Sequence, residues 1–313
     1  MPRVSVVVPV YNSAEFLEEC VDGILDQHFQ DFELILVDDG STDRSPVILQ
    51  KYEEQPKVSI VRLPNNLGLG AARNVGTSMA TGDYIAYIDS DDVVEEFYLE
   101  HLVYGALNYN ADVVQAWVQI LKKEHGEWQK KQHGYYQEEP KLYPADKIER
   151  MAKLSQGHYQ VEAHHKLIRH DLIKQHGLRF ELYTGEDLCY ILQLLYYAKT
   201  VVFMPSVQYH YRINDQGLMA TSSDERAKKA IWSLVRGAKL WDWYLAKMPD
   251  LDKTLKMRLR FYFIENMLKT NVRNACRKVE KEKTYNFAAD AFYQEAPAEA
   301  GLLLLLFRDF VLG

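Results

Sequence analysis

Short apolar segments alternate with helical patterns over the first third of the chain. The run Val4–Val10 is apolar, continuous and rich in β-branched residues, as expected of a strand that is buried on both faces. Comparable segments follow at Phe32–Val37, Val58–Leu63, Tyr84–Ile88 and Asp112–Val118. Because helical segments separate these strands, the order predicts an α/β fold with a mostly parallel sheet and helices on both faces.

The helices between these strands are predicted from capping residues and apolar spacing. Ser13 can cap a helix whose apolar residues, from Phe16 to Leu25, recur at helical spacing. Ser45-Pro46 opens a second helix, since serine is a favoured cap and proline a favoured first-turn residue. Further helices are expected over Gly70–Met79 and Glu95–Leu107.

After the first third, the pattern of apolar and polar residues changes twice. Lys122–Glu139 is polar and aromatic without clear periodicity, which predicts a loop or a hairpin. Two strands, Lys199–Met204 and Val207–Tyr211, are expected on either side of Pro205. From Asp224 onward the pattern is helical with few breakers, which predicts a helical C-terminal extension of the α/β fold.

Length and composition narrow the classes of protein to consider. A chain of 313 residues suits about two domains, and we expect a first domain over residues 1–220 and a helical region over residues 221–313. Hydrophobic residues make up 47% and charged residues 26%, which excludes a disordered chain. The formal net charge of −7 argues against a protein that coats nucleic acid, so no nucleic-acid partner is expected.

The cysteines and the apolar segments indicate the compartment. Cys20, Cys189 and Cys276 are odd in number and far apart, so we expect neither a disulfide framework nor a zinc site. The apolar run after Met1 is too short for a signal peptide, and no stretch reaches the roughly 18 residues that cross a bilayer. A cytoplasmic protein is expected, either soluble or attached to the inner face of the cell membrane.

Polar side chains follow three of the predicted strands at the point where each strand ends. These clusters are Pro9–Asn12, Asp38–Ser41 and Asp89–Asp92. In open α/β sheets, ligands bind outside the carboxyl ends of the strands. One such cluster alone is typical of a turn or a helix cap. Three at one edge of the same sheet predict a binding site there.

The Asp89–Asp92 segment has the composition of a cation site. It holds three carboxylates in four residues with no lysine or arginine nearby, and packed like charges are unfavourable unless a cation neutralises them. In an extended segment, Asp89 and Asp91 project to the same side. Such oxygen ligands suit Mg²⁺ or Mn²⁺. The alternative is a cap on the helix expected from Glu95, although capping needs only one side chain.

Five motifs in order give the sequence a family resemblance. They are VSVVVPVYN (Val4–Asn12), LILVDDGSTD (Leu34–Asp43), NNLGLGAARNVG (Asn65–Gly76), GDYIAYIDSDD (Gly82–Asp92) and GEDLCY (Gly185–Tyr190). Together they resemble the family-2 glycosyltransferases of the A-type nucleotide-sugar fold (GT-A), of the kind found in bacterial polysaccharide biosynthesis. The resemblance covers residues 2–212 and leaves the region after Thr221 uncovered.

The resemblance implies a UDP-sugar donor and gives roles to the matching residues. Asp39 would accept a hydrogen bond from the uracil ring. The other residues expected to line or approach the nucleotide are Pro9, Tyr11, Asn12 and Arg73. Asp89 would face the ribose and the donor sugar, and Ser90, which follows it, is a further candidate for donor binding.

The resemblance also implies a divalent cation, Mn²⁺ or Mg²⁺, on the donor diphosphate. Asp91 would bind this cation, with Asp89 beside it. His210 is a further candidate ligand, and a packing or structural hydrogen-bonding role for this histidine remains open. Such a cation neutralises charge on the diphosphate as the bond to the sugar breaks.

A general base is implied at Asp187, and Glu186 beside it is a further candidate for a catalytic role. The acceptor hydroxyl must lose its proton as it attacks the anomeric carbon, and a carboxylate can take that proton. One displacement with one base inverts the stereochemistry. A helix N-terminus, where both acidic residues are favoured, is the alternative for this pair. Lys166 and the stretch Tyr209–Arg212 resemble later family elements near the acceptor and the diphosphate.

Together these expectations predict an inverting glycosyltransferase that moves a sugar from a UDP-sugar to a hydroxyl of a saccharide acceptor. The transferred sugar is expected to be a hexosyl or N-acetylhexosaminyl group. Two alternatives stay open. A sugar nucleotidyltransferase would release pyrophosphate, but Tyr11–Glu15 lacks the glycines and basic residues typical after the first strand of such enzymes. A non-catalytic nucleotide-sugar-binding subunit is the other alternative.

The C-terminal third carries two surface features. Lys269, Arg273, Arg277 and Lys281 recur at every fourth residue, so on one helix they would form a basic stripe. Six consecutive apolar residues, Leu302–Phe307, cannot all face one side of an exposed helix. We expect contact with a membrane interface, with the protein's own core or with a second copy in a homodimer. A membrane contact would agree with a lipid-linked saccharide acceptor.

Overall fold

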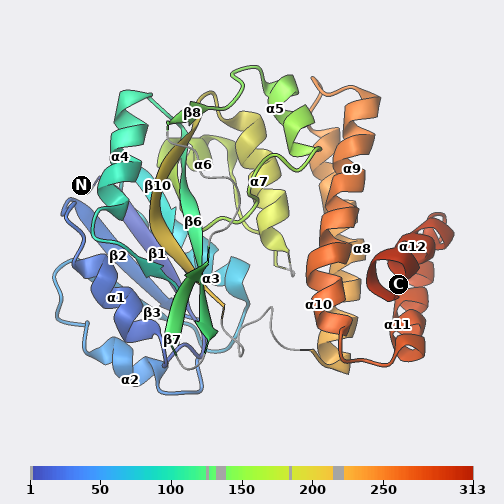
Figure 1. The fold of residues 1–313 in the computed structure, drawn as a ribbon, viewed down its shortest axis with the longest axis horizontal. Coiled ribbons are helices and arrows are strands. Elements are labelled where there is room, and N and C mark those ends of the chain that lie inside the picture. Colours follow the sequence, from blue (N-terminus) through green and yellow to red (C-terminus); the bar gives the residue numbers. More distant parts are fainter. Residues whose placement is uncertain (1–2, 125–126, 132–138, 183–184, 214–221, 313) are drawn as a thin grey trace. The chain divides into compact units, whose positions relative to one another are not determined.

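A computed structural model describes residues 3–124, 127–131, 139–182, 185–213 and 222–312 of the chain (Figure 1). The chain divides into two compact units. Unit 1 comprises Met1–Lys147, Glu162–Leu182 and Leu194–Ile213, and unit 2 comprises Ile148–Val161, Tyr183–Gln193 and Asn214–Gly313. The domain boundary near residue 220 stays a prediction.

Unit 1 is built on one large sheet (Figure 1). Its strands are β1 (Val4–Val10), β2 (Phe32–Asp38), β3 (Val58–Arg62), β4 (Tyr84–Tyr87), β5 (Val93–Val94), β6 (Val113–Glu124), β7 (Glu127–Lys131), β8 (Lys141–Leu142), β9 (Lys166–Arg169) and β10 (Val201–Arg212). The main order is β3-β2-β1-β4-β9-β6-β10-β5, with β7 beside β6 and β8 beside β10. Most of the paired residues lie in parallel ladders, and the predicted α/β fold class is confirmed.

Helices cover both faces of β1, because its side chains alternate between the two faces. Val4, Val6, Val8 and Val10 pack in one core with α1 (Leu17–Leu25), α2 (Ser45–Gln50) and α4 (Tyr98–Asn108). On the other face, α3 (Leu69–Met79) lies against Val7. A Cβ atom at Gly76 would lie 2.3 Å from Cγ1 of Val7, so glycine permits this close approach of helix and strand.

Several local predictions differ from the observed structure. Ser13 does not cap α1 with its side chain, which bonds to Ser90 instead, and its carbonyl accepts the N–H groups of Phe16 and Leu17. The cap of α2 is Arg44, one residue before Ser45. The two strands expected around Pro205 form the single strand β10, which absorbs the proline in a register shift. Of the two alternatives for Lys122–Glu139, a loop or a hairpin, the described residues show a hairpin in which β7 pairs with β6; residues 125–126 and 132–138 lie outside the described residues.

Three further helices lie between β8 and β10 in the sequence. They are α5 (Lys147–Leu154), α6 (His170–His176) and α7 (Glu186–Tyr197). Gly177 ends α6 in the left-handed conformation, with φ +58°.

The C-terminal part of unit 2 is helical, as the pattern predicted. Its elements are α8 (Asp224–Ala246), α9 (Lys253–Met267), η1 (Leu268–Val272), α10 (Arg273–Cys276), α11 (Lys281–Glu295), α12 (Ala300–Phe307) and η2 (Arg308–Leu312), of which η1 and η2 are π-helical. The rings of Trp241 and Phe263 pack α8 on α9, with their centres 4.8 Å apart. The rings of Phe292 and Phe307 pack α11 on α12, with their centres 6.0 Å apart.

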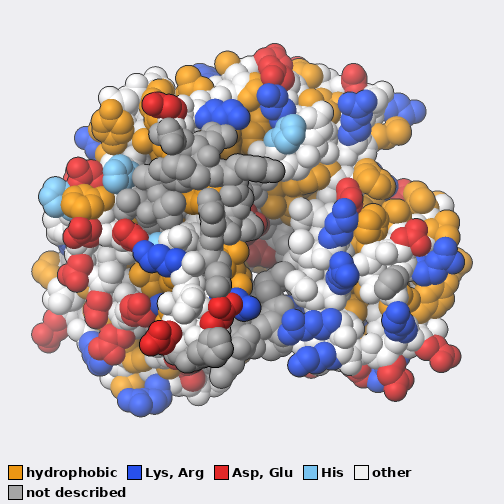
Figure 2. Space-filling model, in the orientation of Figure 1, with side chains coloured by type: hydrophobic (Ala, Val, Ile, Leu, Met, Phe, Trp, Pro, Cys, Tyr) orange, Lys and Arg blue, Asp and Glu red, His pale blue; other side chains and the backbone are white. Residues whose placement is uncertain are grey.

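The surface of this helical part differs from the prediction in one respect. The expected basic stripe does not lie on one helix, because the chain leaves α10 at Cys276 and enters α11 at Lys281. All four of its basic residues are nevertheless exposed. Hydrophobic side chains gather on the surface over α11 and α12 (Figure 2). Among the described residues, no helix is long and apolar enough to span a bilayer.

Candidate functional site

The ends of β1 and β2 are joined through Asn12. This residue adopts a left-handed conformation, with φ +51°. Its side-chain oxygen accepts hydrogen bonds from the backbone N–H groups of Thr42, at 2.8 Å, and of Asp43, at 3.3 Å. Its own N–H donates to Oγ of Ser41 at 3.0 Å. Asn12 therefore orders the loop after β2, and its predicted place beside the nucleotide stays a prediction.

Asp39 is held between the end of β2 and the loop that leads into α3. Its carboxylate is almost fully buried and accepts the backbone N–H groups of Leu67, at 2.7 Å, and Gly68, at 2.8 Å. The next residue is glycine for a steric reason: Gly40 has φ +70°, and a Cβ atom there would lie 2.7 Å from the backbone of Asn65. The Asp39 carboxylate is thus fixed in orientation at the carboxyl edge of the sheet.

Two other residues expected to line the nucleotide occupy different positions. Pro9 lies within β1, opposite Val37 of β2. Tyr11 follows β1 directly and is 45% exposed, so its ring is accessible to a ligand. A contact of either residue with a base stays a prediction.

Asp89 lies at the end of β4 between two cationic groups. Its Oδ1 accepts a hydrogen bond from Nη2 of Arg73 at 2.7 Å, and its Oδ2 lies 3.2 Å from Nδ1 of His164. Arg73 is buried and its guanidinium lies over the ring of Phe180. Burial alone would raise the pKa of the Asp89 carboxyl, but Arg73 and His164 outweigh it and hold that pKa below its ordinary value. Asp89 is therefore ionised at neutral pH.

His164 is placed by stacking as well as by charge. Its ring stacks on those of Tyr209, at 5.1 Å, and Tyr211, at 5.8 Å. Burial would lower the pKa of His164, whereas the carboxylates of Asp89 and Asp92 raise it, and the net direction is upward. A raised pKa favours the imidazolium form that pairs with Asp89.

Asp92 is fully buried and holds the turn after β4 against β10. Its Oδ2 accepts a hydrogen bond from the Tyr209 hydroxyl at 2.5 Å, and its Oδ1 accepts the backbone N–H of Arg212 at 2.8 Å. Burial, and then the neighbouring charge of Asp91, raise the pKa of the Asp92 carboxyl above its ordinary value. The same turn places Asp91 in a half-buried position.

Arg212 ties this turn to α1 and to the β6–β7 hairpin. Its Nη1 donates to the carbonyl of Asp91 at 3.1 Å, and its Nη2 donates to Glu19 at 2.7 Å. The guanidinium lies 4.7 Å from the ring centre of Phe16 and 5.0 Å from that of Trp128. The backbone at Asp91 is thus fixed by a buried arginine.

The turn after β4 also contacts the loop after β1. Ser90, predicted to bind the donor, is buried, and its hydroxyl hydrogen-bonds to Oγ of Ser13 at 2.6 Å. This bond joins the Asp89–Asp92 cluster to the residue directly after the Pro9–Asn12 cluster. Donor contact through Ser90 stays a prediction.

A candidate cation site lies within this network. Atoms of Asp89, Asp92 and His164 lie within 4.8 Å of one another. The carboxylate oxygens suit Mn²⁺ or Mg²⁺, whereas the His164 nitrogen could join them only as a neutral imidazole, because the imidazolium form has no lone pair to offer a metal. Asp91, the predicted ligand, belongs to the same turn but not to this set of three. His210 lies elsewhere, with Nε2 2.5 Å from Oε1 of Glu95, and its role in metal binding stays a prediction.

Sequence reasoning missed His164 as a member of the site. The signal that could have found it is the pair His164-His165 directly before Lys166, a residue already noted for its family resemblance. Lys166 begins β9 and is buried, and its Nζ donates to the carbonyl of Glu162 at 2.5 Å. His165 has φ +54°, a strained conformation at the entrance to this strand.

The predicted general base lies in unit 2. Glu186 and Asp187 form the first turn of α7, where acidic residues interact favourably with the helix dipole. Glu186 is buried and Asp187 is half-buried. Gly185 precedes them with φ +87°, and a Cβ atom there would lie 2.4 Å from Sδ of Met267. The catalytic roles of Asp187 and Glu186 stay predictions.

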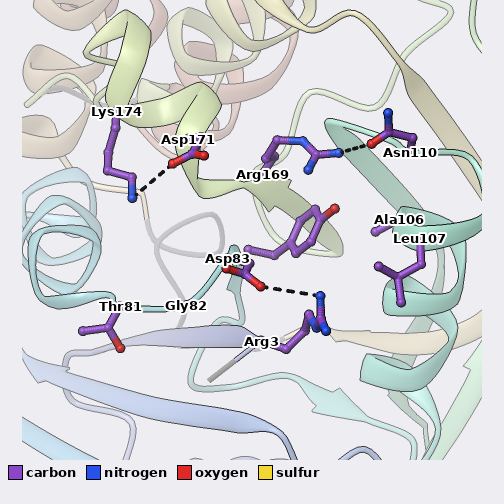
Figure 3. A pocket seen from close by; sticks show the side chains of 11 residues that line it. Arg3, Thr81, Gly82, Asp83, Ala106, Leu107, Asn110, Arg169, Asp171 and Lys174 are labelled. Atoms are coloured by element: carbon purple, nitrogen blue, oxygen red, sulfur yellow. Dashed lines mark hydrogen bonds and ion pairs between the residues drawn. The ribbon is translucent and has the colours of Figure 1, made fainter. Parts of the chain in front are cut away.

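A pocket of about 400 Å³ lies at the opposite, amino edge of β1 and β4 (Figure 3). Its charged side chains pair with neighbouring groups: Arg3 with Asp83 at 3.5 Å, Lys174 with Asp171 at 3.3 Å, and Arg169 with Asn110 at 3.0 Å. Since these groups already have partners, the pocket lacks the concentration of unsatisfied charge that a diphosphate requires. The candidate cation site, which a diphosphate would need beside carboxylates, lies at the carboxyl edge instead.

Replacing Tyr209 with Phe is expected to destabilise unit 1 by about 1–3 kcal/mol, because a buried carboxylate would lose a hydrogen-bond donor. Tyr98→Phe is the matched control: this tyrosine is also fully buried and packs on Tyr209, and its hydroxyl has no hydrogen-bond partner among the described residues. The free energies of unfolding in urea measure both effects. Equal stability of the two variants would contradict a stabilising role for the Tyr209–Asp92 bond.

Comparison with known proteins gives a consistent family match. The sequence model of "Glycosyl transferase family 2" matches residues 5–177. The putative glycosyltransferase EpsH of Bacillus subtilis is 31% identical over 217 residues, covering 68% of this chain and 61% of EpsH. The glycosyltransferase GlyA of Streptococcus pneumoniae is 31% identical over 227 residues, covering 69% of this chain and 31% of GlyA. The chain thus spans less than two thirds of the length of these relatives.

Solved structures of low sequence identity share the fold. The crystal structure of S. aureus TarS 1-349 in complex with UDP-GlcNAc aligns with a TM-score of 0.70 and 18% identity, over 98% of this chain and 90% of TarS 1-349. The mannosyltransferase PcManGT from Pyrobaculum calidifontis, in complex with GDP-Man and Mn²⁺, aligns with a TM-score of 0.57 and 16% identity, over 99% of this chain and 87% of PcManGT. These neighbours support the predicted GT-A fold.

Proposed function

Since the chain belongs to glycosyl transferase family 2, we propose that it transfers a sugar from a UDP-sugar to a hydroxyl of a saccharide acceptor with inversion at the anomeric carbon. The observation that carries this proposal is the convergence of three strand ends. Asn12, Asp39 and Asp89, which follow β1, β2 and β4, are each held by specific hydrogen bonds or ion pairs at one edge of the sheet.

The donor is proposed to lie along this edge. The Asp39 carboxylate keeps lone pairs beyond the two that accept backbone N–H groups, and these can accept an N–H from a uracil ring. The exposed Tyr11 ring offers an apolar face to the base. TarS 1-349 has been crystallised with UDP and with UDP-GlcNAc, which supports a uridine donor for a chain of the same fold.

Asp91 and Asp89 are proposed to hold a divalent cation, Mn²⁺ or Mg²⁺. Atoms of His164 and Asp92 lie within 4.8 Å of Asp89. When bound, such a cation neutralises the charge that develops on the diphosphate. Arg73 and Arg212 hold the turn in place through Asp89 and through the carbonyl of Asp91. Because these partners are buried, the Asp89 carboxylate and the backbone of Asp91 are positioned before the donor arrives, which lowers the cost of binding.

Asp187 is proposed to take the proton of the acceptor hydroxyl. A half-buried carboxylate can accept a proton while remaining accessible to a substrate. The acceptor is proposed to be a saccharide, and a lipid-linked form would agree with the apolar and basic residues of the C-terminal helices. A hexosyl or N-acetylhexosaminyl donor is proposed from the resemblance to polysaccharide-biosynthesis enzymes.

Product analysis tests the reaction class. The chain is incubated with a panel of UDP-sugars and Mn²⁺, and the released products are identified. We expect free UDP with at least one donor. Release of inorganic pyrophosphate would instead identify a nucleotidyltransferase, and absence of turnover with every donor would favour a non-catalytic binding subunit.

A further inference from the structure

The apolar end of unit 2 has one buried and one exposed side. Leu303, Leu304 and Phe307 of α12 are buried, and the Phe307 ring contacts Phe292 of α11. Leu302 and Leu305 are 59% and 52% exposed, and a spacing of three residues places them on the same side of the helix. Helix α12 thus buries one side within unit 2 and still exposes two leucines to solvent, which indicates a contact outside the chain.

The π-helical segment η2, which follows α12 directly, lies against basic residues. We define the basic face as Lys269, Arg273, Arg277 and Lys281, all of which are exposed. The turn η2 packs along η1 and α10, so the last apolar residues lie against this face. Nζ of Lys269 lies 5.0 Å from the ring centre of Phe310, and Nζ of Lys281 donates to the carbonyl of Leu312 at 2.5 Å. The end of the apolar segment, at Phe310 and Leu312, therefore lies beside basic residues that are distant in sequence.

The charge of this surface opposes that of the whole chain. Between Leu268 and Lys281 the cations are Lys269, Arg273, Arg277, Lys278 and Lys281, and Glu280 is the single acidic residue. Lys269 also pairs with Glu265, one turn earlier on the helix. The chain as a whole has a net charge of −7. Figure 2 shows lysine and arginine side chains beside the hydrophobic ones over this part of unit 2.

We propose that unit 2 docks on an anionic lipid surface, with Leu302 and Leu305 inserted among the lipids and the basic face against the headgroups. Apolar residues beside a basic patch are the pattern of an interfacial helix, and α12, with eight residues, lies in the interface and does not span it. A second copy fits less well, because a two-fold contact through this surface would bring one basic face against another. The proposal goes beyond sugar transfer and does not depend on it.

Vesicle co-sedimentation tests the proposal. The full chain is mixed with vesicles of phosphatidylcholine alone or of phosphatidylcholine with phosphatidylglycerol. We expect binding to the mixed vesicles, weak binding to phosphatidylcholine alone, and release at high salt, because screening weakens surface electrostatics. Failure of the unaltered chain to bind the mixed vesicles at low salt would overturn the proposal.

Two variants separate the apolar from the basic contribution. Leu302→Ser with Leu305→Ser should remove most binding, whereas Leu107→Ser, a leucine of α4 in unit 1 that is 54% exposed, should leave binding unchanged. Lys269→Gln with Arg273→Gln should weaken binding by at least on the order of tenfold, since each basic residue near an anionic surface contributes about fivefold. The exposed Lys51→Gln is its control. Unchanged binding of either double variant would overturn the proposal.

Two further measurements distinguish this surface from a dimer contact and from the donor site. Light scattering of the free chain in solution should show the same mass for the unaltered chain and the leucine double variant. A fall from dimer to monomer in that variant would assign the surface to a second copy instead. Thermal shifts with UDP and Mn²⁺ should be equal in all variants, because the proposed donor site lies in unit 1. A loss of the UDP shift together with vesicle binding would contradict a separate docking surface.

Discussion

Replacing Asp91 with Asn is expected to abolish the metal-stimulated part of turnover, a loss on the order of 10²–10³-fold or more. Asparagine has the same shape but no charge, so it cannot neutralise a divalent cation. The backbone of the turn should keep its place, because the Asp91 carbonyl still accepts from Arg212. UDP release is measured against Mn²⁺ concentration, and the unfolding temperature is measured on the same preparations.

Asp31→Asn is the control for this variant. Asp31 is exposed at the start of β2, at the opposite end of the strand from Asp39, so its replacement should alter neither turnover nor metal dependence. Full activity of Asp91→Asn in Mn²⁺ would show that Asp91 is not a metal ligand. A variant that loses activity and also unfolds early would instead reveal a structural role for the Asp91 carboxylate.

Replacing Asp187 with Asn is expected to lower the rate of transfer on the order of 10²–10⁴-fold while UDP binding stays nearly unchanged. The amide cannot accept the proton of the acceptor hydroxyl at neutral pH. The helix itself should persist, because Glu186 remains in the first turn of α7 to interact with its dipole. Initial rates with a saturating donor and calorimetric titration with UDP measure the two quantities.

Asp290→Asn on α11 is a suitable comparison, since Asp290 is exposed in the same unit and lies on a helix that carries no predicted site residue. Its rate should equal that of the unaltered chain. Weaker UDP binding at an unchanged rate of transfer in Asp187→Asn would make Asp187 a donor contact, and the general base would then have to be sought elsewhere.

The sequence predicted the framework of unit 1 well because its signals are local. Val4–Val10 has no polar residue other than Ser5, and the observed β1 has the same bounds. The predicted ends of helices were less accurate where a tertiary contact competes with the local preference of a residue for a capping position. Ser13 is a good capping residue, but its hydroxyl bonds to Ser90, so α1 begins later at Leu17.

The partners of the site residues could not be predicted in the same way. Asp89 is recognisable from its position after β4, yet its partners Arg73 and His164 come from α3 and from the segment before β9. The four-residue strand β9 is too short to give a periodic signal and was not predicted. It runs antiparallel to β4, so its amino end, preceded by His164, lies at the edge where β4 has its carboxyl end.

The amino-acid sequence by itself determined the fold class, the three polar clusters and their common edge, because strand periodicity and the direction of parallel strands are local properties of the chain. Only the tertiary structure decided which charges meet. A buried carboxylate needs a partner, and the identity of that partner depends on strand order and register, as when β9 brings His164 to Asp89. In the same way, the packing of η2 on η1 and α10 set Phe310 and Leu312 beside Lys269 and Lys281 of the basic face.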